Sequence, residues 1–81
     1  MWPLLLDGHL VARVDLNADR ASHTLRVVGA FGESGAPRTR VVAALAGELE
    51  SMASRLGLGG FSVSSLGDLA TELRATAKRV S

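Results

Sequence analysis

The first third of the chain alternates apolar and polar residues in a way that predicts short β-strands. Residues 2–6 are apolar and lead into Asp7-Gly8, a pair typical of two-residue hairpin turns because both turn positions need positive φ. Residues 9–16 then alternate, with Leu10, Ala12, Val14 and Leu16 on one face, which is the pattern of a strand with one buried face. A third strand is expected over residues 24–31. The three segments together predict an antiparallel meander.

The rest of the chain shows helical periodicity. Apolar residues recur at spacings of three and four from Val41 to Leu56, which predicts a helix of about five turns that begins near Pro37 and stops at Gly57. A short strand is expected around residues 61–63, and a second helix from the capping-box-like residues 65–68. The 81 residues therefore predict one α+β domain of order β-β-β-α-β-α: a three-stranded meander with a short fourth strand, packed with two helices.

The register of the first hairpin places apolar residues on both faces of the sheet. A two-residue turn at Asp7-Gly8 sets Leu4 opposite Val11 and leaves Leu5 on the core face. An antiparallel sheet covered on one side normally carries polar residues on the other. The second face is instead expected to carry an apolar set, the predicted interaction face: Trp2, Leu4, Leu6, Val11 and Val28.

Two explanations of this face stay open. Either the second helix covers it, or a partner outside the chain does, because contiguous exposed apolar surface marks an interaction site. The partner would be the rest of a parent protein or a second copy of the chain.

The densest polar segment follows the second predicted strand. A register that opposes Asp15 with Arg26 avoids the repulsion of Arg13 by Arg26, and it leaves residues 17–23 as a loose loop. We expect the charged side chains of this region to hold that loop as a structural polar cluster and not as a catalytic one. Its predicted members are Arg13, Asp15, Asp19 and Arg20.

Composition narrows the range of functions. Nine Lys and Arg against eight Asp and Glu give a net charge of +1, which is not typical of an autonomous nucleic-acid binder. The chain has no cysteine, which excludes disulfides, thiolate zinc sites and thiol nucleophiles and suits a reducing cytoplasm. No apolar run approaches the roughly 20 residues of a membrane span. The two histidines, His9 and His23, are expected at solvent-exposed strand ends, and no metal or cofactor site is predicted.

Two features near the predicted first helix invite comparison with anion sites. The glycine-rich loop of residues 29–37 lies between a strand and a helix, but it matches neither a Walker nor a dinucleotide-binding sequence. Arg38 and Arg40 oppose the helix dipole unless they meet an anion, such as a phosphate, or are simply solvated. Acyl transfer or phosphate chemistry is therefore only a third hypothesis.

One stretch carries a family resemblance. Residues 4–20, with the sequence LLLDGHLVARVDLNADR, and the later Leu25-Arg26-Val27 resemble the C-terminal domain of the winged-helix DNA-binding family that includes the YcaQ-like crosslink-repair DNA glycosylases. The late helix of residues 45–49, ending near Leu56-Gly57, is similar as well, so that the resemblance covers about residues 4–58. Asn17 stands where the family has a lysine, which puts any anion contact of that lysine in doubt here.

The resemblance implies a β-rich domain appended to tandem winged-helix units that grip DNA. Glycosylase activity in that family depends on a Gln-x-Gln or Gln-x-Asp motif upstream, and this chain has no glutamine, so no catalytic residue is carried over. The leading hypothesis is a non-catalytic C-terminal accessory domain, a fragment of a longer, cytoplasmic protein that would bind DNA through its upstream domains. The alternative is a freestanding module that homodimerises through an apolar sheet face.

Overall fold

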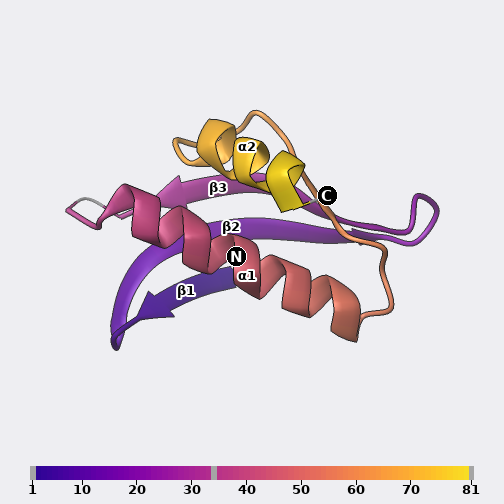
Figure 1. Cartoon of the computed structure of the whole chain (residues 1–81), viewed down its shortest axis with the longest axis horizontal. Coiled ribbons are helices and arrows are strands. Elements are labelled where there is room, and N and C mark those ends of the chain that lie inside the picture. Colours follow the sequence, from indigo (N-terminus) through magenta and orange to yellow (C-terminus); the bar gives the residue numbers. More distant parts are fainter. Residues whose placement is uncertain (1, 34, 81) are drawn as a thin grey trace.

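The predicted α+β fold is confirmed. The computed structural model describes residues 2–33 and 35–80, and the side chains of residues 2–33 and 35–76. The elements run in the order β1 (Trp2–Leu6), β2 (His9–Asp19), β3 (Thr24–Gly32), α1 (Arg38–Arg55), β4 (Phe61–Val63) and α2 (Ala70–Val80) (Figure 1). They form one four-stranded sheet of order β1-β2-β3-β4, in which β4 pairs parallel to β3 and the other pairs are antiparallel.

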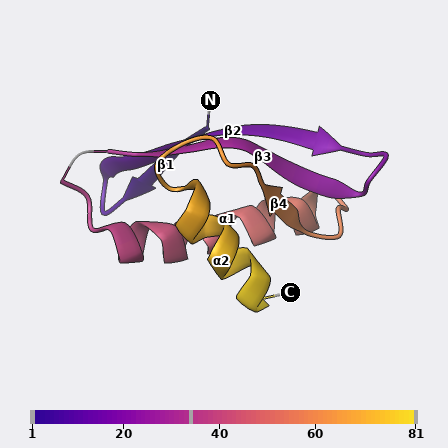
Figure 2. The same cartoon turned by 90° about the horizontal axis from the view of Figure 1, so that it is seen from above.

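Both helices lie on the same face of the sheet, as Figure 2 shows. The core fills the space between the two layers, and its most deeply buried side chains come from both of them: Val14, Leu25, Val27, Val41, Leu45, Leu49, Leu69 and Leu73. Burying each such aliphatic side chain stabilises the fold by about 1.5–3 kcal/mol. The second helix therefore does not cover the back of the sheet, which answers one of the two explanations above. No helix in the described part of the chain is long and apolar enough to cross a membrane.

A β-bulge in β2 corrects the predicted register of the first hairpin. The turn itself is confirmed, with Asp7 at φ 53° and Gly8 at φ 80°. Beyond it, Leu5 pairs with Leu10 but Leu4 pairs with Ala12, so that Val11 is an extra residue without a partner in β1. Val11 and Ala12 both face the core as a result, and the whole of β1 turns over relative to the prediction.

Most of the predicted interaction face is therefore wrong. Leu4 is 5% and Val11 is 7% exposed, and Leu6 packs against the core. Trp2 pairs with Val14 on the core face, yet it stays 45% exposed because the helices contact the sheet mainly at β3 and β4. Leu5, predicted to be in the core, is 61% exposed on the opposite face.

A second bulge lies in β3 and changes the second hairpin. Asp15 pairs with Gly29 and Leu16 with Val27, which leaves Val28 as the extra residue. Arg26 lies opposite Asn17, so the expected pairing of Arg26 with Asp15 is wrong.

The predicted loose loop over residues 17–23 is also wrong. β2 continues to Asp19, whose Oδ1 accepts hydrogen bonds from the backbone N–H groups of Ala21 at 3.1 Å and Ser22 at 3.3 Å. That carboxylate replaces a loop by a tight turn, because it satisfies the N–H groups that the turn leaves free.

The helix ends were predicted unequally well. Gly57 has φ 74°, and the backbone N–H of Leu58 donates to Ala53 at 2.8 Å, which confirms the stop of α1. The capping-box prediction for α2 is wrong, because the helix begins only at Ala70. The carboxylate of Asp68 instead accepts the backbone N–H of Gly32 at the end of β3, at 2.9 Å.

The segment between β4 and α2 lies directly against β3. The N–H of Ala30 donates to Leu66 at 3.1 Å, and the N–H of Leu69 donates back to Ala30 at 3.1 Å. Gly67 sits between these two bonds with φ 103°, and a Cβ added to it would lie 2.0 Å from the carbonyl oxygen of Ala30. Only glycine allows the chain to pass β3 this closely before it enters α2.

We predict that Gly67→Ala lowers the free energy of unfolding by about 2–4 kcal/mol, because it adds both a backbone clash and a strained φ. Gly47→Ala is the matched control. Gly47 lies within α1 with open space around it, so an alanine there should raise stability by about 0.5–1 kcal/mol. Urea unfolding followed by circular dichroism measures both changes. Equal stability of Gly67→Ala and the parent chain would contradict the prediction.

Candidate functional site

The four residues of the predicted structural polar cluster do not meet. Arg13, Asp15 and Asp19 all belong to β2, and an extended strand advances about 3.3 Å per residue, so that Asp15 and Asp19 lie roughly 13 Å apart. Among the described residues, no hydrogen bond or ion pair joins any two of the four. The prediction is wrong because a polar run along one strand is spread out and cannot converge.

Each of these side chains instead has a local structural contact or none. Arg13 pairs with Glu33 across the end of the sheet at 3.2 Å, and Arg20 donates from Nη1 to the backbone carbonyl of Leu56 at 2.9 Å. The second contact joins the β2–β3 turn to the C-terminal end of α1, where a cation is favourable. The carboxylate of Asp15 forms no ion pair or hydrogen bond to any other residue that the structure describes.

Asp19 holds the β2–β3 turn electrostatically. Hydrogen bonds from the side chain and the backbone of Ser22 lower the pKa of its carboxyl, and the nearby charge of Arg26, 3.9 Å away, lowers it further. The ionised carboxylate is therefore the form that the folded turn prefers.

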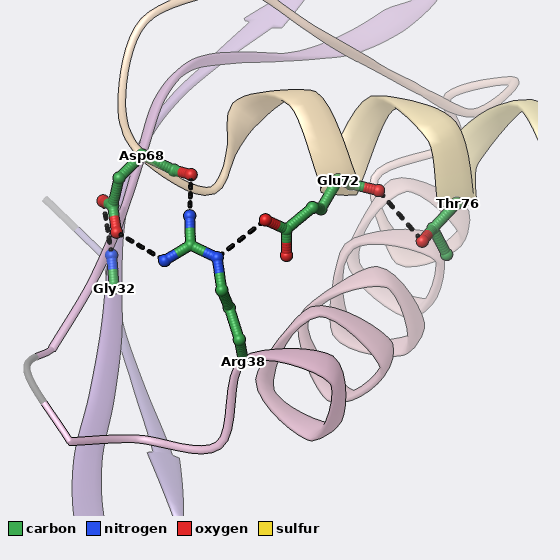
Figure 3. A network of polar contacts seen from close by, with 5 residues as sticks. All are labelled: Gly32, Arg38, Asp68, Glu72 and Thr76. Atoms are coloured by element: carbon green, nitrogen blue, oxygen red, sulfur yellow. Dashed lines mark hydrogen bonds and ion pairs between the residues drawn. The ribbon is translucent and has the colours of Figure 1, made fainter.

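The two arginines at the start of α1, Arg38 and Arg40, meet anions that belong to the chain itself. Figure 3 shows the contacts of Arg38. Arg38 donates from Nε to Glu72 at 2.7 Å, and its two Nη groups donate to the carboxylate and the backbone carbonyl of Asp68. Hydrogen bonding to Glu72 and the charges of Glu72 and Asp68 raise the pKa of Arg38. Because Asp68 also holds Gly32, this network ties the end of β3, the start of α1 and the start of α2 together.

Arg40 pairs with Asp7 of the first hairpin turn at 2.9 Å. The two side chains border a hollow of about 300 Å³, which lies between that turn and the β3–α1 loop. The exposed His9 also lines this hollow. The carboxylates of Asp7 and Glu33 line the same hollow, so a phosphate there would meet two negative charges. Among the described residues, no group of three or more His, Asp or Glu side chains is placed to hold a metal ion.

The candidate site is the face of the sheet that the helices leave open. Its rows follow from the register: Pro3, Arg13 and Phe31 form one, while Asn17, Arg26 and Ser62 form another. Apolar side chains with large exposed fractions lie beside these rows: Val28 at 43% and Leu66 at 56% between them, and Leu5 at 61% beyond the first, where it pairs with Leu10. We call the apolar part of this surface the outer-face patch, which consists of Pro3, Leu5, Val28, Phe31 and Leu66.

Because Gly29 has no side chain, Phe31 and Leu66 of this patch can occupy the space above it. A Cβ added to Gly29 would lie 2.9 Å from the ring of Phe31 and 3.4 Å from Leu66, so both side chains use the space above the glycine. Leu66 precedes α2 and lies at the edge of the open face. A glycine between two apolar side chains on one strand face is a sequence signal that could have located this part of the patch.

The polar residues around the patch are mostly neutralised. Arg13 pairs with Glu33 and Arg26 with Asp19, and all four side chains stay partly exposed. Asp15, opposite Gly29, is the remaining charged residue on this face in the described part of the chain. The surface is therefore a small apolar area with a nearly balanced polar rim, which is the composition of a protein–protein interface.

Comparison of the chain with protein-family models, with curated proteins and with solved structures gives no match.

We predict that Asp19→Asn removes part of the acid sensitivity of the fold. Because the folded pKa of Asp19 lies below its ordinary value of 3.8, its contribution is complete above that pH and is lost as the pH falls through the lowered pKa. The stability difference between the parent chain and Asp19→Asn should therefore be largest near pH 7 and shrink as the pH falls below 3.8 and through the lowered pKa. Urea unfolding at a series of pH values measures it. Asp15→Asn, which removes a carboxylate of the same strand but no turn hydrogen bond, controls for the lost charge. A difference that stays constant from pH 7 to pH 2 would refute the assignment.

Proposed function

We propose that this chain is a non-catalytic accessory domain of a winged-helix DNA-binding protein, a class that includes DNA-repair glycosylases, and that it braces the DNA-binding units. The observation that carries the proposal is the open face of the sheet. The outer-face patch is apolar, exposed and left uncovered by both helices, which lie on the other face (Figure 2). Such a surface is typical of a domain that packs against another.

The size of the open face favours a linked neighbour over a second copy. Strands lie about 4.8 Å apart and rise about 3.3 Å per residue, and the longest strand, β2, has 11 residues, so the flat area of the face is at most roughly 700 Å². β1 and β4 are shorter, and the apolar part is smaller still. Stable dimers between separate chains bury about 800 Å² on each partner. Interfaces between domains of one chain are smaller and more polar, because the linkage itself keeps the partners together.

The hairpin that carries the family resemblance also carries part of this surface. Residues 4–20 cover most of β1, the Asp7-Gly8 turn and all of β2, and this hairpin supplies Leu5 and Arg13 to the open face. In the proposed parent, the hairpin would pack against the winged-helix units. The absence of cysteine supports a cytoplasmic location for that parent.

The charges support a role in which the parent, and not this domain, contacts DNA. Four arginines, Arg13, Arg26, Arg38 and Arg40, form ion pairs with carboxylates of the same chain. Phosphate contacts by these side chains would have to displace those carboxylates. We expect binding of the isolated chain to duplex DNA to be no tighter than the micromolar range near physiological salt, with a shallow salt dependence.

The interface is tested by binding this chain to the polypeptide encoded immediately upstream of it, by isothermal titration calorimetry. We expect Val28→Glu and Leu66→Glu to weaken binding at least tenfold each, because each buries a charge in an apolar contact. Ala43→Glu, an exposed position on α1 away from the open face, is the matched control and should leave binding unchanged. Circular dichroism confirms that all three variants are folded.

Three results would contradict the proposal. An upstream reading frame that encodes no winged-helix segments would contradict the proposed parent protein. Equal binding by all variants would contradict the role of the outer-face patch as the interface. A dimer of the isolated chain that Val28→Glu dissociates would favour the homodimeric module instead.

A further inference from the structure

The sheet has a free edge at β1. β1 is the first strand in the sheet order and pairs with β2 only, so its other side has no partner strand in the described part of the chain. The free side of an edge strand presents unpaired N–H and C=O groups to which a strand of another molecule can bind. Edges of this kind are normally protected by charged side chains, by a bulge or by proline.

The geometry of the hairpin determines which residues of β1 direct their backbone N–H and C=O groups to this edge. Leu6 and His9 flank a two-residue turn and are therefore the closing hydrogen-bonded pair of the hairpin. Backbone groups alternate along a strand, so those of Leu6, Leu4 and Trp2 point toward β2. Those of Leu5 and Pro3 point to the free edge. The bulge does not alter this alternation, because its extra residue, Val11, lies in β2.

One of these two residues cannot donate a hydrogen bond. Pro3 has no N–H group, and the edge is where a proline can occupy a strand without breaking the sheet. Suppose that β1 pairs with β1 of a second copy about a two-fold axis that opposes Leu4 with Leu4. Pro3 then lies opposite Leu5 of the second copy, at a pair that should exchange two N–H···O bonds. Each of the two symmetric pairs loses one bond, and each proline ring stands against the facing strand.

The side chains of β1 otherwise favour such pairing. β1 contains no charged residue, and its exposed side chains, Trp2 at 45% and Leu5 at 61%, lie on opposite faces of the strand. Both would lose exposed apolar surface against a neighbouring strand. We propose that the free edge of β1 is a latent pairing site for a second copy of this chain, and that Pro3 keeps it closed. This inference is independent of the proposed function, because it concerns the edge of the sheet and not its open face.

The test compares the oligomeric state of the parent chain and Pro3→Val by sedimentation equilibrium over about 10–500 μM. Valine restores the missing donor and favours the extended backbone. We expect the parent chain to be monomeric and Pro3→Val to dimerise with an affinity at least tenfold higher. Pro3→Ala, which restores the donor with a smaller side chain, should change in the same direction. In both variants the amide of residue 3 should become protected from hydrogen exchange as the concentration rises.

Two double variants separate edge pairing from other association. In the first, Leu5→Pro is added to Pro3→Val and removes the edge-facing N–H of residue 5. In the second, Val28→Glu is added to Pro3→Val, and this addition changes only the open face. The first should return to the monomer and the second should stay dimeric. The proposal is overturned if Pro3→Val and Pro3→Ala are as monomeric as the parent, if the dimer survives Leu5→Pro, or if the parent chain already pairs through β1.

Discussion

The whole molecule depends on a single constraint: two helices can cover only one face of the sheet, so the strands must direct most of their aliphatic side chains to that face. The two bulges of the meander meet this constraint. The extra residue at Val11 brings Leu4, Leu6 and Val11 to the helices while it exposes Leu5. Each buried aliphatic side chain is worth about 1.5–3 kcal/mol, against about 0.5–1.5 kcal/mol for a net hydrogen bond lost at the bulge. The bulge is therefore the favoured arrangement, even though it interrupts the ladder.

The polar contacts take their places from this layering. Once α1 and α2 lie side by side on the sheet, their first turns meet at the end of β3, where Arg38, Asp68 and Glu72 form their network. The arginine lies at a helix start that has no acidic residue in its first turn, and the carboxylates of the other helix supply the missing negative charge. Arg40 finds the same compensation at Asp7 in the hairpin turn. Charges that look unfavourable within one element are thus balanced between elements.

Features that depend on neighbouring residues can be predicted from the sequence. The faces of a strand cannot be predicted beyond a bulge, because the bulge inserts one unpaired residue. The Asp7-Gly8 turn, the apolar stripe of α1 and the stop at Gly57 are local features, and all three are confirmed. The predicted faces of β1 were wrong, because a side-chain period of two means that one unpaired residue reverses every position beyond it. The apolar runs Leu10-Val11-Ala12 and Val27-Val28 interrupt the alternation at both bulges, but they do not show which residue is left without a partner. The long-range partners of Arg38, Arg40 and Arg20 lie 30 or more residues away and could not be deduced from spacing.

The same reversal explains why the sheet still has an apolar second face, although different residues form it. Leu4 and Val11 leave that face, and Leu5, Phe31 and Leu66 take their place beside Val28. The composition of residues 2–6 is so apolar that either register leaves aliphatic side chains outside the core. A strand of this kind suits a domain interface if its exposed face contacts a partner and its free edge does not pair with another strand. The open face combines apolar residues with balanced ion pairs, which suits contact with a linked neighbour. The adjacent edge lacks charged side chains and has no N–H donor at Pro3, which on our proposal keeps a second copy from pairing there.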